Sequence, residues 1–219
     1  MRAVRQPDPG GADCRLPVRD SLCVMQATGG TTLNADKAPR FAARAVAVLG
    51  ATALLALALD QWVKYLSTEH LDPNEPVRIL GGLIYLSLLR NSGAAFSFGD
   101  THTWIFPVIT LVVIGWIGWM ATRLRSVPWA LALGLVLGGA LGNLADRLFR
   151  APGPFQGKVV DMISVFAPYA EKFPVFNIAD SCLTVGVCLA VLLELTGRQR
   201  DGSRLKNTKN EQVETEETA

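Results

Sequence analysis

The chain has 219 residues, half of them apolar, and a mean hydropathy of +0.28. This composition is too apolar for an ordinary soluble domain of this length and favours a small polytopic membrane protein. The net charge of +2, from 21 basic and 19 acidic residues, gives no indication of a nucleic-acid partner. The two histidines, His70 and His102, lack the spacing of metal ligands, so we expect no metal site.

The two ends of the chain are predicted to be tails. Residues 1–40 are rich in Arg, Pro, Gly, Asp and Thr and show no apolar periodicity, which is typical of disorder. The first apolar run begins only near Phe41, which does not fit a cleaved signal peptide, and Met25 is an alternative start to Met1. Residues 198–219 are polar and mixed in charge. We therefore expect a folded domain over residues 41–197 between two disordered cytoplasmic tails.

Four apolar segments have the length that crosses a hydrocarbon core of about 30 Å. They run over residues 41–59, 104–121, 128–149 and 176–196. Between the first two, Val77–Leu89 has strand-type content interrupted by Gly81 and Gly82, which indicates a short hairpin or curved sheet outside the membrane.

Basic residues near the ends of these segments predict their orientation. On one side the short segments carry these basic residues: Lys37, Arg40, Arg44, Arg123, Arg125, Arg198, Arg200 and Arg204. The loops on the other side also contain Arg78, Arg90, Arg147, Arg150, Lys158 and Lys172, so the bias holds only for the short segments. Short loops rich in Lys and Arg face the cytoplasm, so both termini are expected inside. The first and third spans then run outward, and the fourth runs inward.

Polar residues gather at the outer ends of the spans and in the loop between the last two. They are Asp60, Lys64, Asn143, Asp146, Arg147, Asp161, Asn177 and Asp180. Polar residues without a common function would be expected at both ends of the spans, so their clustering at one end favours a functional site. Asp60 and Lys64 stand four apart and are expected to form an ion pair, which alone could simply mark the end of a helix.

Asp161 and Asp180 suggest a chemistry for this cluster. Two neighbouring carboxylates cannot both ionise readily, so one keeps a proton while the other stays charged. Aspartic proteases use such a pair to activate water and to polarise the scissile carbonyl. A proton or cation relay and a purely structural pair are alternatives, and the spacing does not distinguish the three.

Five motifs around the spans resemble those of the lipoprotein signal peptidase (signal peptidase II) family. In chain order they are DQWVKYL, RNSGAAFSFG, GGALGNLADRLFR, VVDMISV and FNIADSCLTVG, within Leu59–Gly186. The resemblance implies an all-α membrane protein of four transmembrane helices with a small extracytoplasmic β-sheet. It also implies an intramembrane aspartic endopeptidase that removes the signal peptide from diacylglyceryl-modified bacterial prolipoproteins, cutting before the lipidated cysteine.

Matched by motif, the catalytic pair is Asp161 and Asp180. The family's other polar positions, expected to support the pair or contact substrate, are Asp60, Lys64, Asn91, Asn143, Asp146, Arg147 and Asn177. The resemblance implies no metal and no organic cofactor, lipidated prolipoproteins and membrane lipid as partners, and a monomer. It places the enzyme in the bacterial plasma membrane, with the active site at the outer leaflet boundary. The long N-terminal tail and the insertion at residues 151–157 depart from the family pattern.

Two other classes and one other carboxylate are alternatives. A proton-coupled transporter would need polar residues through the membrane depth, yet the interiors of the first two spans are almost wholly apolar. A structural membrane protein would not need both aspartates. Asp146 also lies at the outer boundary, but Arg147 beside it is expected to keep it ionised, which suits a structural clamp.

Overall fold

A computed structural model describes residues 37–93 and 104–204, with side chains from residue 42. Its elements in chain order are α2 (Lys37–His70), β1 (Val77–Ile79), a 3-10 turn (Leu80–Gly82), β2 (Ile84–Asn91), α3 (Ile105–Ala121), α4 (Val127–Phe149), β3 (Val159–Val165) and α5 (Ile178–Leu195). Most of the two predicted tails lies outside the described residues. Residues 37–40 belong to α2, and residues 198–204 form a short turn after α5.

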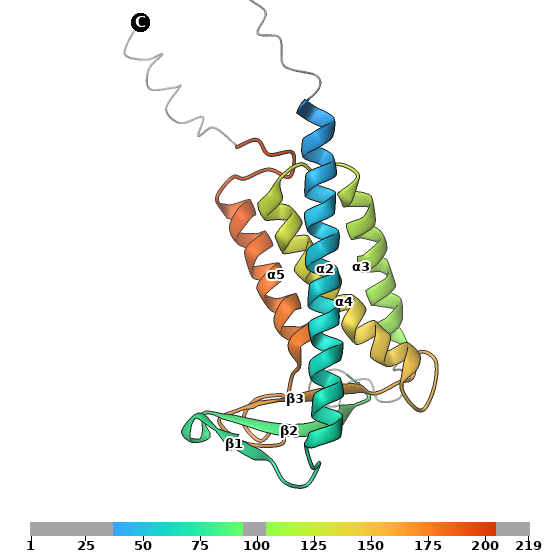
Figure 1. Ribbon diagram of the computed structural model, residues 1–219, viewed down its shortest axis with the longest axis vertical. Coiled ribbons are helices and arrows are strands. Elements are labelled where there is room, and N and C mark those ends of the chain that lie inside the picture. The colour runs from blue at the N-terminus through green and yellow to red at the C-terminus, as the bar shows by residue number, and fades with distance from the viewer. Residues whose placement is uncertain (1–36, 94–103, 205–219) are drawn as a thin grey trace, which may run out of the picture. The chain divides into compact units, whose positions relative to one another are not determined.

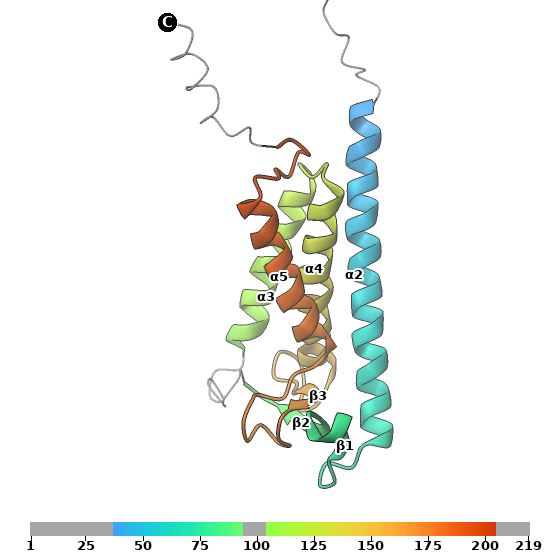
Figure 2. The ribbon, with the colours of Figure 1, turned by 90° about the vertical axis from the view of Figure 1, so that its left-hand side faces the viewer.

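The four predicted spans correspond to four apolar helices. Helix α4 lies at the centre and packs against α2, α3 and α5, with α2 on one side of it and α3 on the other (Figure 2). Within the described residues, three helices are long and apolar enough to cross a membrane, over Ala42–His70, Val127–Phe149 and Ile178–Leu195. The fourth, α3, has 17 residues, close to the lower limit of about 17 for a spanning helix. The structure confirms the predicted membrane fold.

Small residues allow the helices to approach α4 closely. An added Cβ at Gly138 of α4 would lie 2.6 Å from the carbonyl oxygen of Ala53 in α2. At Gly186 of α5 it would lie 2.8 Å from the carbonyl oxygen of Ala132 in α4. Such contacts bring backbones together where the lipid supplies no hydrophobic drive for helix association.

The first helix is longer than its apolar run. The prediction ended it at residue 59, whereas α2 continues to His70. Asp60 and Lys64 therefore lie inside a continuous helix and do not mark its end. The extension mixes charged and polar residues with apolar ones, so a criterion based on a continuous apolar run ends before it.

A three-stranded antiparallel sheet in the order β1-β2-β3 lies at the end of the helices where α2 ends and α5 begins (Figure 1). The predicted hairpin over Val77–Leu89 is present as β1 and β2. The third strand was missed, and it places Asp161 in a strand where the sequence predicted a loop. In the register of β2 with β3, Leu89 faces Asp161 and Asn91 faces Val159.

Candidate active site

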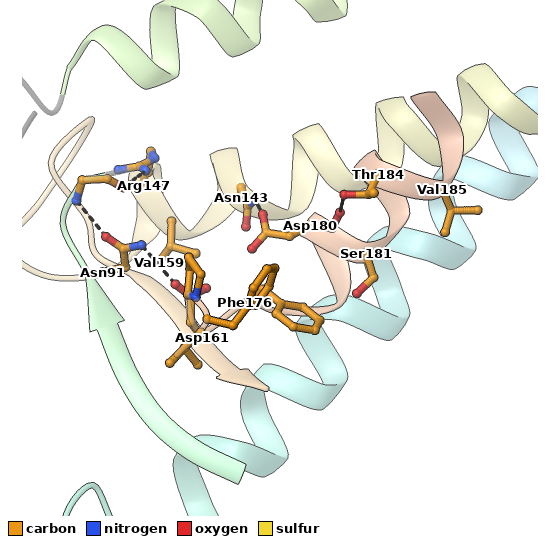
Figure 3. Close-up of a pocket in the computed structure, with 14 residues that line it drawn as sticks. Asn91, Asn143, Arg147, Val159, Asp161, Phe176, Asp180, Ser181, Thr184 and Val185 are labelled. Carbon is orange, nitrogen blue, oxygen red and sulfur yellow. Dashed lines mark hydrogen bonds between the residues drawn. The ribbon is translucent and has the colours of Figure 1, made fainter. Parts of the chain in front are cut away.

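A cavity of about 690 Å³ opens between the sheet and the adjoining ends of α4 and α5. Its lining combines polar groups with an apolar wall: Asn91, Gly93, Asn143, Arg147, Val159, Asp161, Phe173, Pro174, Val175, Phe176, Asp180, Ser181, Thr184 and Val185. Figure 3 shows Asp161 and Asp180 entering this space from a strand and a helix, with Asn91 beside the first and Asn143 beside the second. The structure therefore brings the predicted pair to one cavity.

Asp161 is nearly inaccessible, with 2% of its surface exposed. Its carboxyl accepts hydrogen bonds from Asn91 Nδ2 at 3.2 Å and from Asn177 Nδ2 at 2.7 Å. Burial, together with the nearby charge of Asp180, raises the pKa of Asp161 to about 7, against the opposing effect of the two amide hydrogen bonds. This carboxyl therefore holds a proton close to neutral pH.

Asp180 is the third residue of α5 and is only half-buried. Asn177 caps the helix: its Oδ1 accepts from the Asp180 N–H at 2.9 Å, and its own N–H donates to Asp180 Oδ2 at 3.3 Å. This reciprocal arrangement is a capping box. Asn143 Nδ2 donates to the other carboxyl oxygen, Oδ1, at 2.7 Å. The start of a helix also favours a negative charge at this position.

Two amides connect the two carboxyl groups. Asn177 Nδ2, which donates to Asp161, also lies 3.2 Å from Asn143 Oδ1. Asn143 in turn donates to Asp180. The chain Asp161–Asn177–Asn143–Asp180 thus joins a strand, the start of α5 and α4 by hydrogen bonds alone. It fixes the position of both carboxyl groups relative to each other.

Behind this chain lies a buried set of charges centred on Lys64. The ammonium Nζ is 2.8 Å from Asp60 Oδ2 and 2.8 Å from Asp146 Oδ2, and all three side chains are fully buried. It also donates to Asn143 Oδ1 at 3.2 Å. The predicted Asp60–Lys64 ion pair is confirmed, and it belongs to a network that reaches the amide chain.

The two aspartates bound to Lys64 each hold the backbone beside a catalytic candidate. Asp60 Oδ1 accepts from the N–H of Ala179, the residue before Asp180, at 2.9 Å. Asp146 Oδ2 accepts from the N–H of Val160, the residue before Asp161, at 3.2 Å. Lys64 therefore sits between two carboxylates that fix the backbone on both sides of the cavity.

The expected pairing of Asp146 with Arg147 is wrong. Asp146 pairs with Lys64 and with Arg150, whose Nε is 2.6 Å from Oδ1. Consecutive helical residues point in different directions, whereas residues four apart share a face. Arg147 instead donates to the carbonyl oxygens of Ser92 at 3.3 Å and Gly93 at 3.1 Å. Asp146 therefore keeps its expected structural role, but its cationic partners are Lys64 and Arg150.

One further polar side chain at the site was not singled out in the sequence. Gln61 Nε2 is 3.1 Å from Asp60 Oδ2, 3.1 Å from the carbonyl oxygen of Gly142 and 3.4 Å from Asp146 Oδ1. Its signal was its place in DQWVKYL, three residues before Lys64. Asn91, the last residue of β2, occupies its expected place, while most of the motif that follows it lies outside the described residues.

Among the side chains that the structure describes, those of residues 42–93 and 104–204, the buried ionisable ones are Asp60, Lys64, Asp146, Arg147 and Asp161. All belong to the cavity or the network behind it, at the sheet end of the helices. A relay across the membrane would need such groups along the whole helix length, so this distribution favours local chemistry. In the same ranges, His, Cys, Asp and Glu side chains form no group of three placed to hold a metal ion.

Comparison with known proteins gives a consistent match. The family model described as Signal peptidase (SPase) II matches residues 52–196. A lipoprotein signal peptidase of Streptomyces coelicolor is 51% identical over 160 residues, covering 73% of this chain and 76% of the relative. One of Mycobacterium avium is 44% identical over 172 residues, covering 78% of this chain and 90% of the relative.

Two solved structures share the fold. Both are described as bacterial membrane enzymes determined by the in meso method, and both are 28% identical to this chain. The first has a TM-score of 0.59 and covers 71% of this chain and 90% of its own. The second has a TM-score of 0.57 and covers 66% of this chain and 90% of its own.

Proposed function

Because this chain belongs to the signal peptidase II family, we propose that Asp161 and Asp180 are the catalytic pair with which it cleaves prolipoproteins. The protein is a membrane endopeptidase of the aspartic type that removes signal peptides from prolipoproteins. The observation that carries the assignment of the pair is the amide chain that joins the two carboxyl groups across one cavity.

The different surroundings of the two carboxyls support different roles. Asp161, with a pKa raised to about 7, enters the reaction protonated and donates its proton to the scissile carbonyl oxygen. Asp180 enters as the carboxylate and accepts a proton from the attacking water. Because two ionised carboxylates close together would repel each other, the pair carries one proton between them.

The reaction then balances within the pair. The water oxygen bonds to the carbonyl carbon while one water proton passes to Asp180 and the Asp161 proton passes to the carbonyl oxygen. When the C–N bond breaks, Asp180 gives its proton to the leaving amine and Asp161 recovers its own from the hydroxyl. Both carboxyls return to their starting states.

The apolar wall of the cavity supports binding of an extended, lipid-bearing peptide. Phe173 and Phe176 approach from the segment before α5, and Val185 comes from α5 itself. Apolar pockets with a few polar groups are typical of sites for such ligands. The acyl chains of a diacylglyceryl cysteine would then lie in the bilayer, and cleavage would fall just before that cysteine.

The topology we propose has both termini in the cytoplasm and the cavity at the outer leaflet boundary. The basic residues in the short segments at the other end of the helices support it, including Arg123, Arg125 and Arg198.

The test replaces each catalytic aspartate by its amide. Asp161→Asn and Asp180→Asn should each lower cleavage by about a hundredfold or more, since each removes a proton-transfer group. The measurement is conversion of a purified lipidated prolipoprotein, beside yield and melting of the variants. Glu171→Gln, an exposed position near the cavity, is the control and should cleave like the parent. More than a few per cent activity in either catalytic variant would contradict the assignment.

A further inference from the structure

A second pocket lies between the start of α4 and the segment after α5. These helix ends lie opposite the sheet (Figure 1). Its volume is about 280 Å³. It is lined by two residues at the start of α4 and by five that follow α5: Ser126, Pro128, Arg198, Gln199, Gly202, Ser203 and Arg204. We call it the α4-start pocket. None of its residues takes part in the catalytic site.

The wall of this pocket is built by specific hydrogen bonds. The carbonyl oxygen of Arg200 accepts from the backbone N–H groups of Arg125 and Ser126, both at 3.0 Å. Trp129 Nε1 donates to the carbonyl oxygen of Arg198 at 2.8 Å. The Arg200 guanidinium also lies over the Trp129 ring, 5.4 Å from its centroid. The segment after α5 is thereby fastened to the start of α4.

The start of α4 has donors that lack acceptors. Ser126 is its N-cap residue, but the side chain makes no cap hydrogen bond. Only 8% of Ser126 is exposed, and its hydroxyl makes no hydrogen bond to the groups described in residues 42–93 and 104–204. The first turn of this described helix contains no acidic residue. The partial positive charge at the N-terminus of this 23-residue helix is therefore balanced neither by a capping side chain nor by a carboxylate of its first turn.

Two arginines complete the pocket. Arg198 and Arg204 face each other in an isolated antiparallel bridge, and directly opposite residues project to the same face. In the described part of the chain neither forms an ion pair with a carboxylate. The nearby carboxylate, Asp201, already accepts from the N–H and the hydroxyl of Ser203 at 2.8 and 2.7 Å.

We propose that the α4-start pocket binds a phosphate group, supplied by an anionic phospholipid of the surrounding bilayer. A phosphodiester offers acceptor oxygens to the Ser126 hydroxyl, to the first-turn N–H groups and to two guanidinium groups. The pocket lies at the end of apolar, membrane-length helices, which is the depth of lipid headgroups. Arg123 and Arg125, which precede Ser126 in the chain, favour a headgroup with net negative charge over a zwitterionic one.

The experiment uses the full chain purified in neutral detergent. Native mass spectrometry measures retention of phosphatidylglycerol or phosphatidylcholine, and melting curves measure the response to inorganic phosphate. The first variant is Arg198→Gln with Arg204→Gln. Its matched control, Arg78→Gln with Lys172→Gln, removes the same charge from exposed positions at the sheet end.

A second variant covers the case in which the double variant folds poorly. Ser126→Asp places a carboxylate where an N-cap acceptor is favoured, so it should melt at or above the parent temperature. The same carboxylate repels a phosphate group and satisfies the free donors. Loss of lipid binding in a protein that is at least as stable therefore cannot be ascribed to misfolding.

The parent and the control should retain phosphatidylglycerol about tenfold better than phosphatidylcholine. Both pocket variants should lose this preference. Stabilisation by inorganic phosphate alone, abolished in both variants, would support the phosphate site and reject the lipid as its source. Equal retention of the two lipids by the parent without any phosphate response, or parental binding by both variants, would overturn the proposal. These readouts do not involve cleavage and do not depend on the catalytic assignment.

Discussion

Asp161 and Asp180 are the same residue type in two different environments. The first is buried on strand β3 and accepts hydrogen bonds from two amide side chains, and the second is half-buried at the start of helix α5. Environment alone can separate the roles of two carboxyls in this way. The pKa of Asp161, raised to about 7 mainly by burial, makes this separation measurable.

The raised pKa predicts how stability depends on pH. The folded protein binds the Asp161 proton more tightly than the unfolded chain, whose pKa is near 3.8. The stabilising contribution of protonated Asp161 is therefore fully present below pH 3.8 and is lost as the pH rises through about 7. Melting curves in detergent across this range should show Asp161→Asn with a flatter pH dependence than the parent. Glu171→Gln should keep the parental slope, and identical slopes for all three proteins would contradict the argument.

Lys64 is the residue on which the buried charge network depends. Lys64→Met removes the cation between Asp60 and Asp146 and leaves both carboxylates buried without it. Breaking a buried pair in this way costs about 3–5 kcal/mol. We expect a large fall in melting temperature together with loss of cleavage, because the backbone beside both catalytic aspartates loses its support. Lys172→Met, at an exposed position, should change stability by less than about 0.5 kcal/mol. A Lys64→Met protein that melts like the parent would show that the network does not stabilise the fold.

At the scale of elements, α4 positions the site because its small residues admit its neighbours. An added Cβ at Gly142 would lie 2.5 Å from Asp60 Oδ2, an atom already held by Lys64, and 3.2 Å from the Ala179 Cβ. Gly142 thus lies where α4 meets both α2 and α5. The charge network can form only because the helices come this close.

This contact yields a prediction with an internal control. Gly142→Ala should destabilise the protein by about 1–3 kcal/mol, the usual cost of overpacking, and should lower cleavage as Asp60 is displaced. Gly115→Ala is the same change in α3, where a Cβ would meet nothing within 4 Å. Because glycine is unfavourable within a helix, Gly115→Ala should stabilise by about 0.5–1 kcal/mol. Melting curves of the two variants should move in opposite directions, and a common direction would contradict the role given to Gly142.

The elements also show what could be read from the sequence. The apolar helices were predictable because membrane length and apolar composition are local properties, and β1 and β2 were predictable from strand-type content. The end of α2 was not, since charged and polar residues interrupt the apolar run from Asp60 onward. Strand β3 was missed because its pairing partner, β2, lies about seventy residues earlier in the chain and cannot be identified from the local pattern.

The functional site, too, was predictable from the sequence only in part. Motif resemblance named the two aspartates and their supporting residues, and the structure brings them to one cavity or to the network behind it. The cations that bind Asp146 could not be read from adjacency, because Arg150 shares its helix face and Lys64 comes from another helix. Gln61 was hidden for a similar reason: its acceptors lie on α4 as well as on its own helix.

On the scale of the whole folded domain, the two ends of the helices differ in chemistry. The sheet end holds the buried ionisable groups and the catalytic cavity, while the other end carries arginines near the start of α4. Positive residues in short segments stay on the cytoplasmic side. This asymmetry supports the orientation in which the cavity faces outward.

Cysteine labelling tests that orientation directly. Two single-cysteine proteins, Glu171→Cys and Thr122→Cys, carry the thiol at exposed positions at the sheet end and at the α3–α4 connection. The background replaces the natural thiols by serine at Cys14, Cys23, Cys182 and Cys188. In spheroplasts, a membrane-impermeant maleimide should label position 171 and leave position 122 unlabelled. After lysis both should label, which controls for accessibility. Labelling of position 122 before lysis and of position 171 only afterwards would reverse the topology and place the cavity on the cytoplasmic side, where exported prolipoproteins could not reach it from outside.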